Sequence, residues 1–305
     1  TQTFGQRLKT QWERYKSYLS IASVFMYAEQ GLRDMFEQVK LIDSAMTELK
    51  KVTDETDTTY NRFLKNANTQ AKQLGVAITD LVSSTADFAR LGYNLDDSFN
   101  LAQVATMYSN VGDLGIDEAT QNIVSIMKAF GIEANNAISI IDKLNEVGNR
   151  FAVSSASIGS GLEDSAAALQ AAGNTLDESI GLFVGANEVL QDTSKTSTAL
   201  RTIAMRLRKT SVELSASGED AEGAAESMSS LRAQIKALSG VDIMIDDTTF
   251  KNTTQILREL SGVWDTMSDT SQAAVTNLIA GVRQANSLNA IMTNFSQVEK
   301  SINAS

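Results

Sequence analysis

The sequence predicts an all-α protein, and three features of its composition lead to this prediction. The chain of 305 residues contains no proline, although average usage would give about 15 in this length. Its hydrophobic and charged fractions, 43% and 21%, are those of an ordinary globular protein. Alanine, leucine, glutamine and glutamate, which favour helices, are plentiful, whereas β-rich folds normally use proline in their turns. We therefore expect many helices and at most one short strand, near residues 241–245.

The first quarter of the chain, residues 1–74, predicts a long amphipathic or coiled-coil helix. From residue 35 onward, the seam positions alternate in spacing between four and three residues, which is the coiled-coil pattern. Polar residues at three seam positions, Thr53, Thr56 and Gln70, weaken it, and the mixed a and d side chains favour a trimer or larger assembly over a dimer. A helix that packs within its own domain would show the same spacing, so both interpretations stay open. The apolar seam residues are Met35, Val39, Ile42, Met46, Leu49, Tyr60, Phe63 and Leu74.

Residues 75–209 predict a domain of shorter helices joined by tight turns. A glycine followed by a capping residue and acidic residues recurs along this segment. Glycine can end one helix in the left-handed conformation, and a polar side chain then accepts the free amides of the next helix. The acidic residues lie at the positive end of the helix dipole and can close a capping box. We expect turns at Gly92, Gly115 and Gly173 and helix caps at Asn94 and Thr175.

The last third of the chain predicts a loop followed by a smaller helical subdomain, residues 230–305. Residues 210–229 are rich in serine, glycine and glutamate, so we expect a flexible loop there. Residues 241–245 alternate in polarity, as a short strand or an extended link would. Asp269 and Gln272 have the spacing of a capping box. Helices are expected at 230–238, 253–267, 269–280 and 283–295.

The missing residue types exclude most catalytic chemistry. Without cysteine or histidine the chain can form no disulfide, no Cys/His zinc site and no histidine-based triad. Residues 157–161 only partly resemble a nucleophile elbow, because Ile158 replaces the first glycine. Asp242, Asp246 and Asp247 lack the spacing of a calcium loop and are expected to form a solvated acidic turn. We expect no enzyme activity, no metal and no cofactor.

The charge pattern limits the partners of the chain. The net charge is −11, which disfavours binding to nucleic acid in general. One basic stretch is expected to be the solvated C-terminus of a helix rather than a nucleic-acid patch. No segment has the roughly 20 consecutive apolar residues of a membrane-spanning helix. The chain begins without methionine, so we expect it to be a piece of a longer protein. The basic stretch consists of Arg201, Arg206, Arg208 and Lys209.

Seven short stretches, taken in order, resemble the core region of phage tail tape measure proteins. Each stretch is weak evidence alone, but their common order makes the resemblance fairly specific, and it runs from about residue 35 to residue 294. Members of that family are usually much longer and often carry hydrophobic or wall-degrading segments downstream, and those activities are not carried over to this chain. The stretches are residues 45–53, 86–93, 127–132, 142–145, 198–201, 240–244 and 279–286.

The resemblance implies a structural virion protein that occupies the lumen of a phage tail tube. Such a protein templates the tube length during assembly in the host cytoplasm and leaves the tube at genome ejection. The implied partners are further copies of the chain, the tail tube protein, tail assembly chaperones and distal tail proteins. The lack of proline and cysteine suits a protein that must thread and refold. The alternative from a different class is a helical coiled-coil segment of an adhesin, a delivery system or a signalling receptor.

Overall fold

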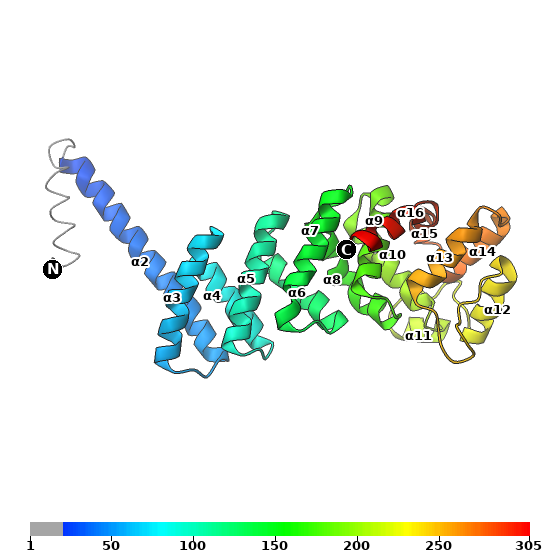
Figure 1. Cartoon of the computed structure of the whole chain (residues 1–305), viewed down its shortest axis with the longest axis horizontal. Helices are drawn as coiled ribbons and strands as arrows, with labels where there is room; N and C mark the ends of the chain where they lie inside the picture. Colours follow the sequence, from blue (N-terminus) through cyan, green and yellow to red (C-terminus); the bar gives the residue numbers. More distant parts are fainter. Residues whose placement is uncertain (1–20) are drawn as a thin grey trace. The chain divides into compact units, whose positions relative to one another are not determined.

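The structure, a computed structural model, describes the backbone of residues 21–305 and the side chains of residues 37–305. This described part contains fifteen α-helices, one 3₁₀ turn at Ala134–Asn136 and no β-strand, so the all-α prediction is confirmed (Figure 1). None of the described helices is long and apolar enough to cross a lipid bilayer. The chain divides into two compact units, residues 1–92 and residues 93–305.

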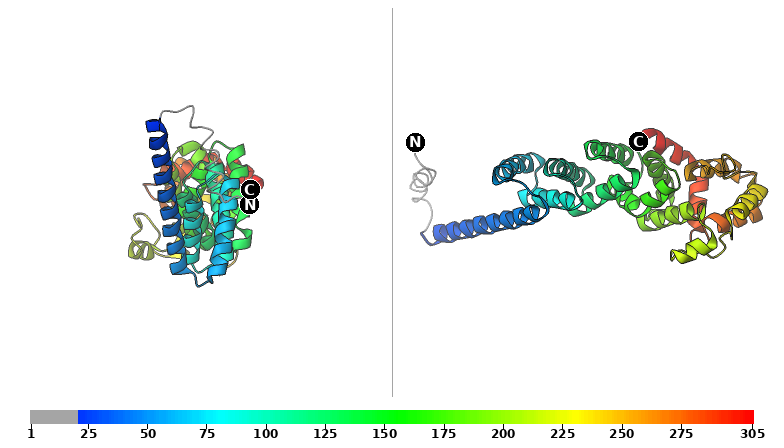
Figure 2. Two further views of the ribbon diagram at one scale, coloured as in Figure 1. Left: turned by 90° about the vertical axis from the view of Figure 1, so that its left-hand side faces the viewer. Right: turned by 90° about the horizontal axis from the view of Figure 1, so that it is seen from below.

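The first unit contains three helices, α2 (Ile21–Val52), α3 (Asp57–Leu74) and α4 (Ile78–Arg90). Both α2 and α3 pack against α4 (Figure 2). An ion pair of 3.5 Å between Arg90 and Glu48 also joins α4 to α2. We expected a boundary after Leu74, but α4 covers the apolar face of α2 and therefore belongs to the first unit.

The long helix predicted over residues 35–74 is interrupted. Helix α2 ends at Val52, and α3 begins at Asp57. Thr56 is the N-cap of α3, and its side chain accepts the amide of Thr59 at 3.2 Å. The hydroxyl of Thr53 lies 2.8 Å from the hydroxyl of Tyr60. Two of the polar seam residues thus build a turn, because threonine hydroxyls bond nearby backbone and side-chain groups in competition with the helix.

The second unit begins with three consecutive helical hairpins. Within this unit α8 packs against both α6 and α10, so the second helices of the three hairpins form a row (Figure 1). Helix α9 also packs against α8 and α10, and α16 covers α9. The hairpins are α5 (Leu95–Gly112) with α6 (Ile116–Phe130), α7 (Ile138–Arg150) with α8 (Ser155–Ala171), and α9 (Leu176–Leu190) with α10 (Thr193–Arg206).

Two glycines of α8 allow the close packing of this row. A methyl group at Gly159 would overlap the hydroxyl of Tyr108, and one at Gly161 would overlap the ring of Phe183. Tyr108 is fully buried and donates its hydroxyl hydrogen to the carbonyl oxygen of Ser155 at 2.8 Å. The segment 157–161, which partly resembles a nucleophile elbow, therefore lies inside a helix and serves helix packing.

The C-terminal helices pack around α9 and α10. Helices α10, α14 and α15 contact one another, and α13 contacts both α9 and α15. Residues 241–251 form a turn closed by two backbone hydrogen bonds, Ile245 to Thr249 and Lys251 to Ile243, rather than the strand considered above. The helices are α11 (Ser211–Ala216), α12 (Met228–Ser239), α13 (Thr253–Trp264), α14 (Asp269–Ile279), α15 (Ala285–Thr293) and α16 (Phe295–Ala304).

Candidate functional site

The guanidinium of Arg206, the last residue of α10, is buried and makes four hydrogen bonds to backbone carbonyl groups. Only 1% of this residue is exposed. Its Nη1 donates to the carbonyl oxygens of Asn277 and Leu278 at 3.0 and 3.3 Å, in the last turn of α14. Its Nη2 donates to the carbonyl oxygens of Asp220 and Glu222 at 3.0 and 2.6 Å. One side chain thus joins α10, α14 and the segment between α11 and α12.

The charge of Arg206 is compensated by carbonyl dipoles rather than by a contacting carboxylate. Burial lowers the pKa of the Arg206 guanidinium, and the carboxylates of Asp220 and Glu222 act in the opposite direction. Carbonyl oxygens at a helix C-terminus carry partial negative charge, which favours a cation there. An arginine keeps its proton in proteins, so the fold must supply these acceptors wherever the side chain is buried.

Arg208 has a similar role two residues further along. Its Nη2 donates to the carbonyl oxygens of Ala172 and Lys251 at 2.8 and 2.5 Å, and its guanidinium lies 4.7 Å from the centre of the Phe250 ring. Burial lowers the pKa of Arg208 to about 10. The expectation of a solvated basic stretch is therefore wrong for Arg206 and Arg208. Both guanidinium groups are used to hold distant backbone segments together.

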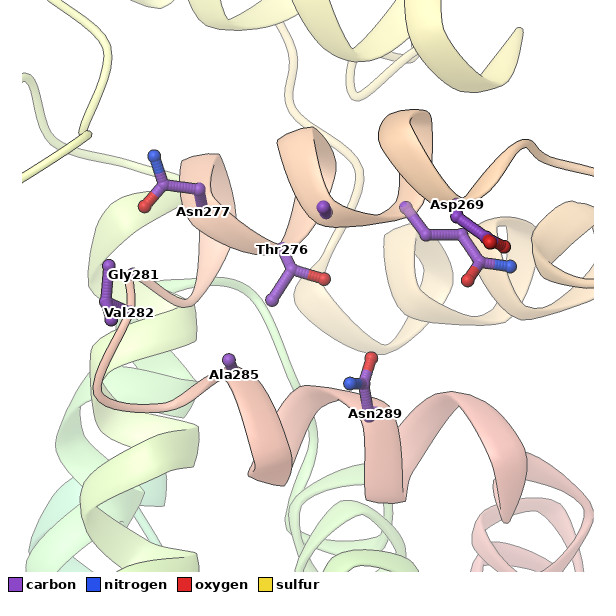
Figure 3. A pocket seen from close by; sticks show the side chains of 9 residues that line it. Asp269, Thr276, Asn277, Gly281, Val282, Ala285 and Asn289 are labelled. Atoms are coloured by element: carbon purple, nitrogen blue, oxygen red, sulfur yellow. The ribbon is translucent and has the colours of Figure 1, made fainter.

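A groove of about 420 Å³ lies beside Arg206, between α14 and α15. Figure 3 shows Thr276 from α14 and Asn289 from α15 facing this groove. Gly281 has a φ of +71°, and a methyl group there would come within 2.8 Å of Nη2 of Arg206. The lining contains amide, hydroxyl and small apolar groups: Asp269, Gln272, Ala273, Thr276, Asn277, Gly281, Val282, Ala285 and Asn289.

One comparison with known proteins identifies the family. The model of the phage-related minor tail protein family matches residues 65–281, which is more than half of the chain.

The chain belongs to the phage-related minor tail protein family.

The matched segment runs from α3 to Gly281, so it contains Arg206 and the segments that Arg206 holds. No solved structure matches the chain significantly.

Two of the predicted caps of this tail protein lie at helix starts. Asn94 is the N-cap of α5, and its side-chain oxygen accepts the amide of Asp97 at 2.8 Å. Thr175 is the N-cap of α9 and forms a capping box with Glu178, at 3.2 and 2.8 Å.

The cap predicted at Asp269 is displaced by one residue. Ser268 has the extended backbone of an N-cap, and its hydroxyl accepts the amide of Ser271 at 3.2 Å. Asp269 is the first residue of α14. It therefore lies at the positive end of the helix dipole without being the cap.

The three predicted turn glycines differ in conformation. Gly92 and Gly173 have φ values of +94° and +86°, as a left-handed turn requires. Gly115 has a φ of −63° and is the N-cap of α6. The left-handed residue that ends α5 is Asp113, with a φ of +52°. A short aspartate side chain tolerates this conformation, which is why the glycine was not needed there.

The predicted seam residues lie in different environments within the first unit. Val39 is 64% exposed, and Ile42 and Leu74 are partly exposed. The side chain of Met35 lies outside the described residues. The remaining four are buried within the unit, because the chain turns at residues 53–56 and packs α3 against α4. These are Met46, Leu49, Tyr60 and Phe63.

The acidic turn predicted at residues 242–247 is only partly solvated. Asp242 accepts two hydrogen bonds from Arg232, at 2.8 and 2.9 Å, and one from Lys236 at 3.1 Å. These bonds, those from Arg232 above all, lower the pKa of Asp242. Asp246 accepts the amides of Thr248 and Thr249, both at 2.8 Å. The carboxylates of Asp242 and Asp246 thus stabilise the turn.

The role of Arg206 was missed by sequence reasoning, although a signal for it exists. Ala199 and Ile203 precede Arg206 by seven and three residues, so all three lie on one face of α10. Both are fully buried. An arginine on an apolar helix face predicts a buried guanidinium with acceptors from elsewhere in the chain.

The structural role of Asn174 was also not predicted from the sequence. It is 4% exposed and lies in the turn between α8 and α9. Its side-chain oxygen accepts both the amide and the hydroxyl of Thr254 at 2.9 Å, while its amide donates to the carbonyl oxygen of Leu169 at 2.8 Å. The residue therefore fixes the start of α13 on this turn.

Proposed function

We propose that this tail protein is a tape measure protein. In this role it lies in the lumen of the growing tail tube, templates the tube length and leaves the tube when the genome is ejected. The family match over residues 65–281 is the observation that carries the proposal. The ordered resemblance of seven short stretches to tape measure cores and the helical architecture support it further.

The proposed role is structural and requires neither catalysis nor a cofactor. Copies of the chain associate as a trimer or a larger assembly and contact the tail tube protein, tail assembly chaperones and distal tail proteins. In this role the chain does not bind nucleic acid in a sequence-specific way. Assembly takes place in the host cytoplasm, and the mature location is the tail lumen of the virion.

Helix α2 is the best candidate for axial length within the chain. It has 32 residues, which at 1.5 Å per residue span about 48 Å. Val39 and Leu41 are 64% and 50% exposed, and the first buried side chain described on α2 is Ala45. Residues 37–41 of α2 are all exposed, and an exposed stretch of helix can contribute length along a tube.

Deleting residues 23–43 from α2 tests the proposal in a phage that carries this gene. The deletion removes three whole heptads, so it keeps the helical register approximately and shortens the helix by about 30 Å. The matched control replaces the same residues with alanine except at the seam positions Met35, Val39 and Ile42, which keeps the seam, the helix and its length. Tail lengths are measured by electron microscopy for both variants and for the parent phage.

We expect the deletion to shorten the tails by about 30 Å and the alanine variant to leave them unchanged. Intact tails of parental length in the deletion variant would contradict a measuring role for this chain and favour a docking or assembly-initiating role. Equal shortening in both variants would mean that tail length depends on the side chains of this segment and not on the length of the helix.

A further inference from the structure

The segment between α10 and α12 is a closed loop with little apolar anchorage. We call residues 211–225 the strap. The amide of Ser211 donates to the carbonyl oxygen of Ala225 at 2.9 Å and closes its base. Leu214 and Ala225 are the only buried residues of the strap, at 1% and 6% exposed. We expected this region to be a flexible loop, but it contains α11 and is attached to the protein at defined points.

The main attachment of the strap is polar. Nη2 of Arg206 holds the carbonyl oxygens of Asp220 and Glu222, at 3.0 and 2.6 Å. Two further ion pairs lie at the rim, Arg201 with Glu219 at 2.7 Å and Arg283 with Asp220 at 3.6 Å. Exposed arginines such as these contribute little, because water screens the charges. The guanidinium of Arg206 is therefore the group on which attachment depends.

The strap backbone also lies directly on the end of α14. Gly223 has a φ of +73°, and a methyl group there would come within 2.5 Å of the side-chain amide of Asn277. Gly218 has the same φ of +73°, but a methyl group there would meet nothing within 4 Å. The two glycines have equal backbone strain on substitution, and only Gly223 lies against α14. They form a matched pair for testing the attachment.

We propose that Arg206 is a latch, and that the strap, α11 included, opens as a unit while the other helices of residues 93–305 stay folded. Regions with few buried apolar contacts open at lower free energy than the core around them. Opening leaves Nη1 bound to Asn277 and Leu278 and gives Nη2 access to water. The cation is therefore never left buried without partners, which is what makes a local opening feasible. An open strap uncovers this cation beside the groove of α14 and α15. The inference does not depend on the tape measure proposal.

Limited proteolysis of the full chain with a glutamate-specific protease tests the latch. The strap contains Glu213, Glu219 and Glu222, and cleavage of a transiently opened segment follows the population of its open form. The variants are Arg206→Met, which removes the donors of the latch, and Gly223→Ala, which places a methyl group against the exposed side-chain amide of Asn277 and leaves Arg206 in place. Gly218→Ala is the control for the strain that a methyl group causes at positive φ. Cleavage sites are identified by mass spectrometry, and helicity is followed by circular dichroism.

We expect cleavage within the strap to be about ten-fold faster in Arg206→Met than in the parent protein, with no change in cleavage elsewhere. The nicked protein should keep its helicity. Gly223→Ala and Gly218→Ala should both be cleaved more slowly than Arg206→Met, because both keep the latch. The exposed side chain of Asn277 can rotate away from the methyl group of Gly223→Ala. Should Arg206→Met fail to fold, the parent protein decides the question: strap cleavage that rises with urea as steeply as global unfolding does would overturn the proposal. Strap cleavage in Arg206→Met equal to that of the parent would also overturn it. So would acceleration that occurs only together with cleavage throughout residues 93–305, because the strap would then open only by global unfolding.

Discussion

At the scale of single residues, glycines inside helices have opposite effects according to what faces them. Gly161 of α8 faces the ring of Phe183, whereas Gly262 of α13 has no atom within 4 Å of the position of a methyl group. Both lie in regular helix, where alanine is intrinsically preferred. The difference between the two sites is therefore one of packing alone.

We predict opposite stability changes for alanine at these two positions. Gly161→Ala should lower the free energy of unfolding by about 1–3 kcal/mol, because the methyl group forces the buried ring of Phe183 to move. Gly262→Ala should raise it by about 0.5–1 kcal/mol, because the helix gains a residue with less conformational freedom when unfolded. Urea denaturation followed by circular dichroism measures both. A stabilising effect of Gly161→Ala would mean that α8 and α9 are further apart than described.

The carboxylate of Asp242 should make stability depend on pH in the acidic range. Its ordinary pKa of 3.8 is lowered in the folded protein, mainly by the hydrogen bonds from Arg232. The folded state therefore holds the proton less tightly than the unfolded state. The ionised carboxylate stabilises the folded protein above about pH 4, and this stabilisation is lost as the pH falls below it.

Asp242→Asn should remove the stabilisation that the ionised carboxylate of Asp242 provides. The difference in unfolding free energy between the parent and the variant should be largest near neutral pH and should close below about pH 4. Denaturation curves collected over a series of pH values measure it. A difference that stays constant down to about pH 2 would show that the ionised carboxylate is not what stabilises the turn.

At the scale of elements, helix starts depend on one polar side chain each. Asn94→Ala and Thr175→Ala should each lower the free energy of unfolding by about 1 kcal/mol, because each leaves amides of a helix N-terminus without a partner. Thermal and chemical denaturation measure the loss. Unchanged stability in both variants would mean that water replaces these caps fully.

The start of α14 gives a sharper test, because two neighbouring residues compete for the role of cap. Ser268→Ala should cost about 1 kcal/mol, since the hydroxyl accepts the amide of Ser271. Asp269→Ala should cost only a few tenths of a kcal/mol, roughly the value of an exposed charge near a helix N-terminus. The reverse order would restore Asp269 as the cap.

At the scale of the whole molecule, the association of copies remains a prediction about α2. A fragment ending at residue 75 would lack α4 and uncover the face of α2 that α4 covers, so fragment 1–92 is the correct one to study. We expect a trimer or larger assembly in sedimentation equilibrium at high concentration. Val39→Asp should weaken it without loss of helicity, because this side chain is 64% exposed. A fragment that stays monomeric at high concentration would contradict the assembly prediction.

Much of the fold was predictable because its causes are local. The lack of proline, the periodicity of apolar residues and the caps at Asn94 and Thr175 act over one or two helical turns, and a short window of sequence contains them. The start of α13, expected at residue 253, is Thr253. The one-residue error at Asp269 has the same local origin, because Ser268 and Asp269 are both acceptable caps.

Only the tertiary structure decided which partner each apolar or charged side chain has. The spacing from Met35 to Leu74 fits a continuous seam and a packed unit equally well, and the turn at residues 53–56 with α4 beyond it selects the packed unit. The burial of Arg206 depends on carbonyl groups of Asn277 and Leu278, about 70 positions away in the chain. A cation can leave water only where such acceptors converge, and convergence is a property of the folded chain that no short window of sequence contains.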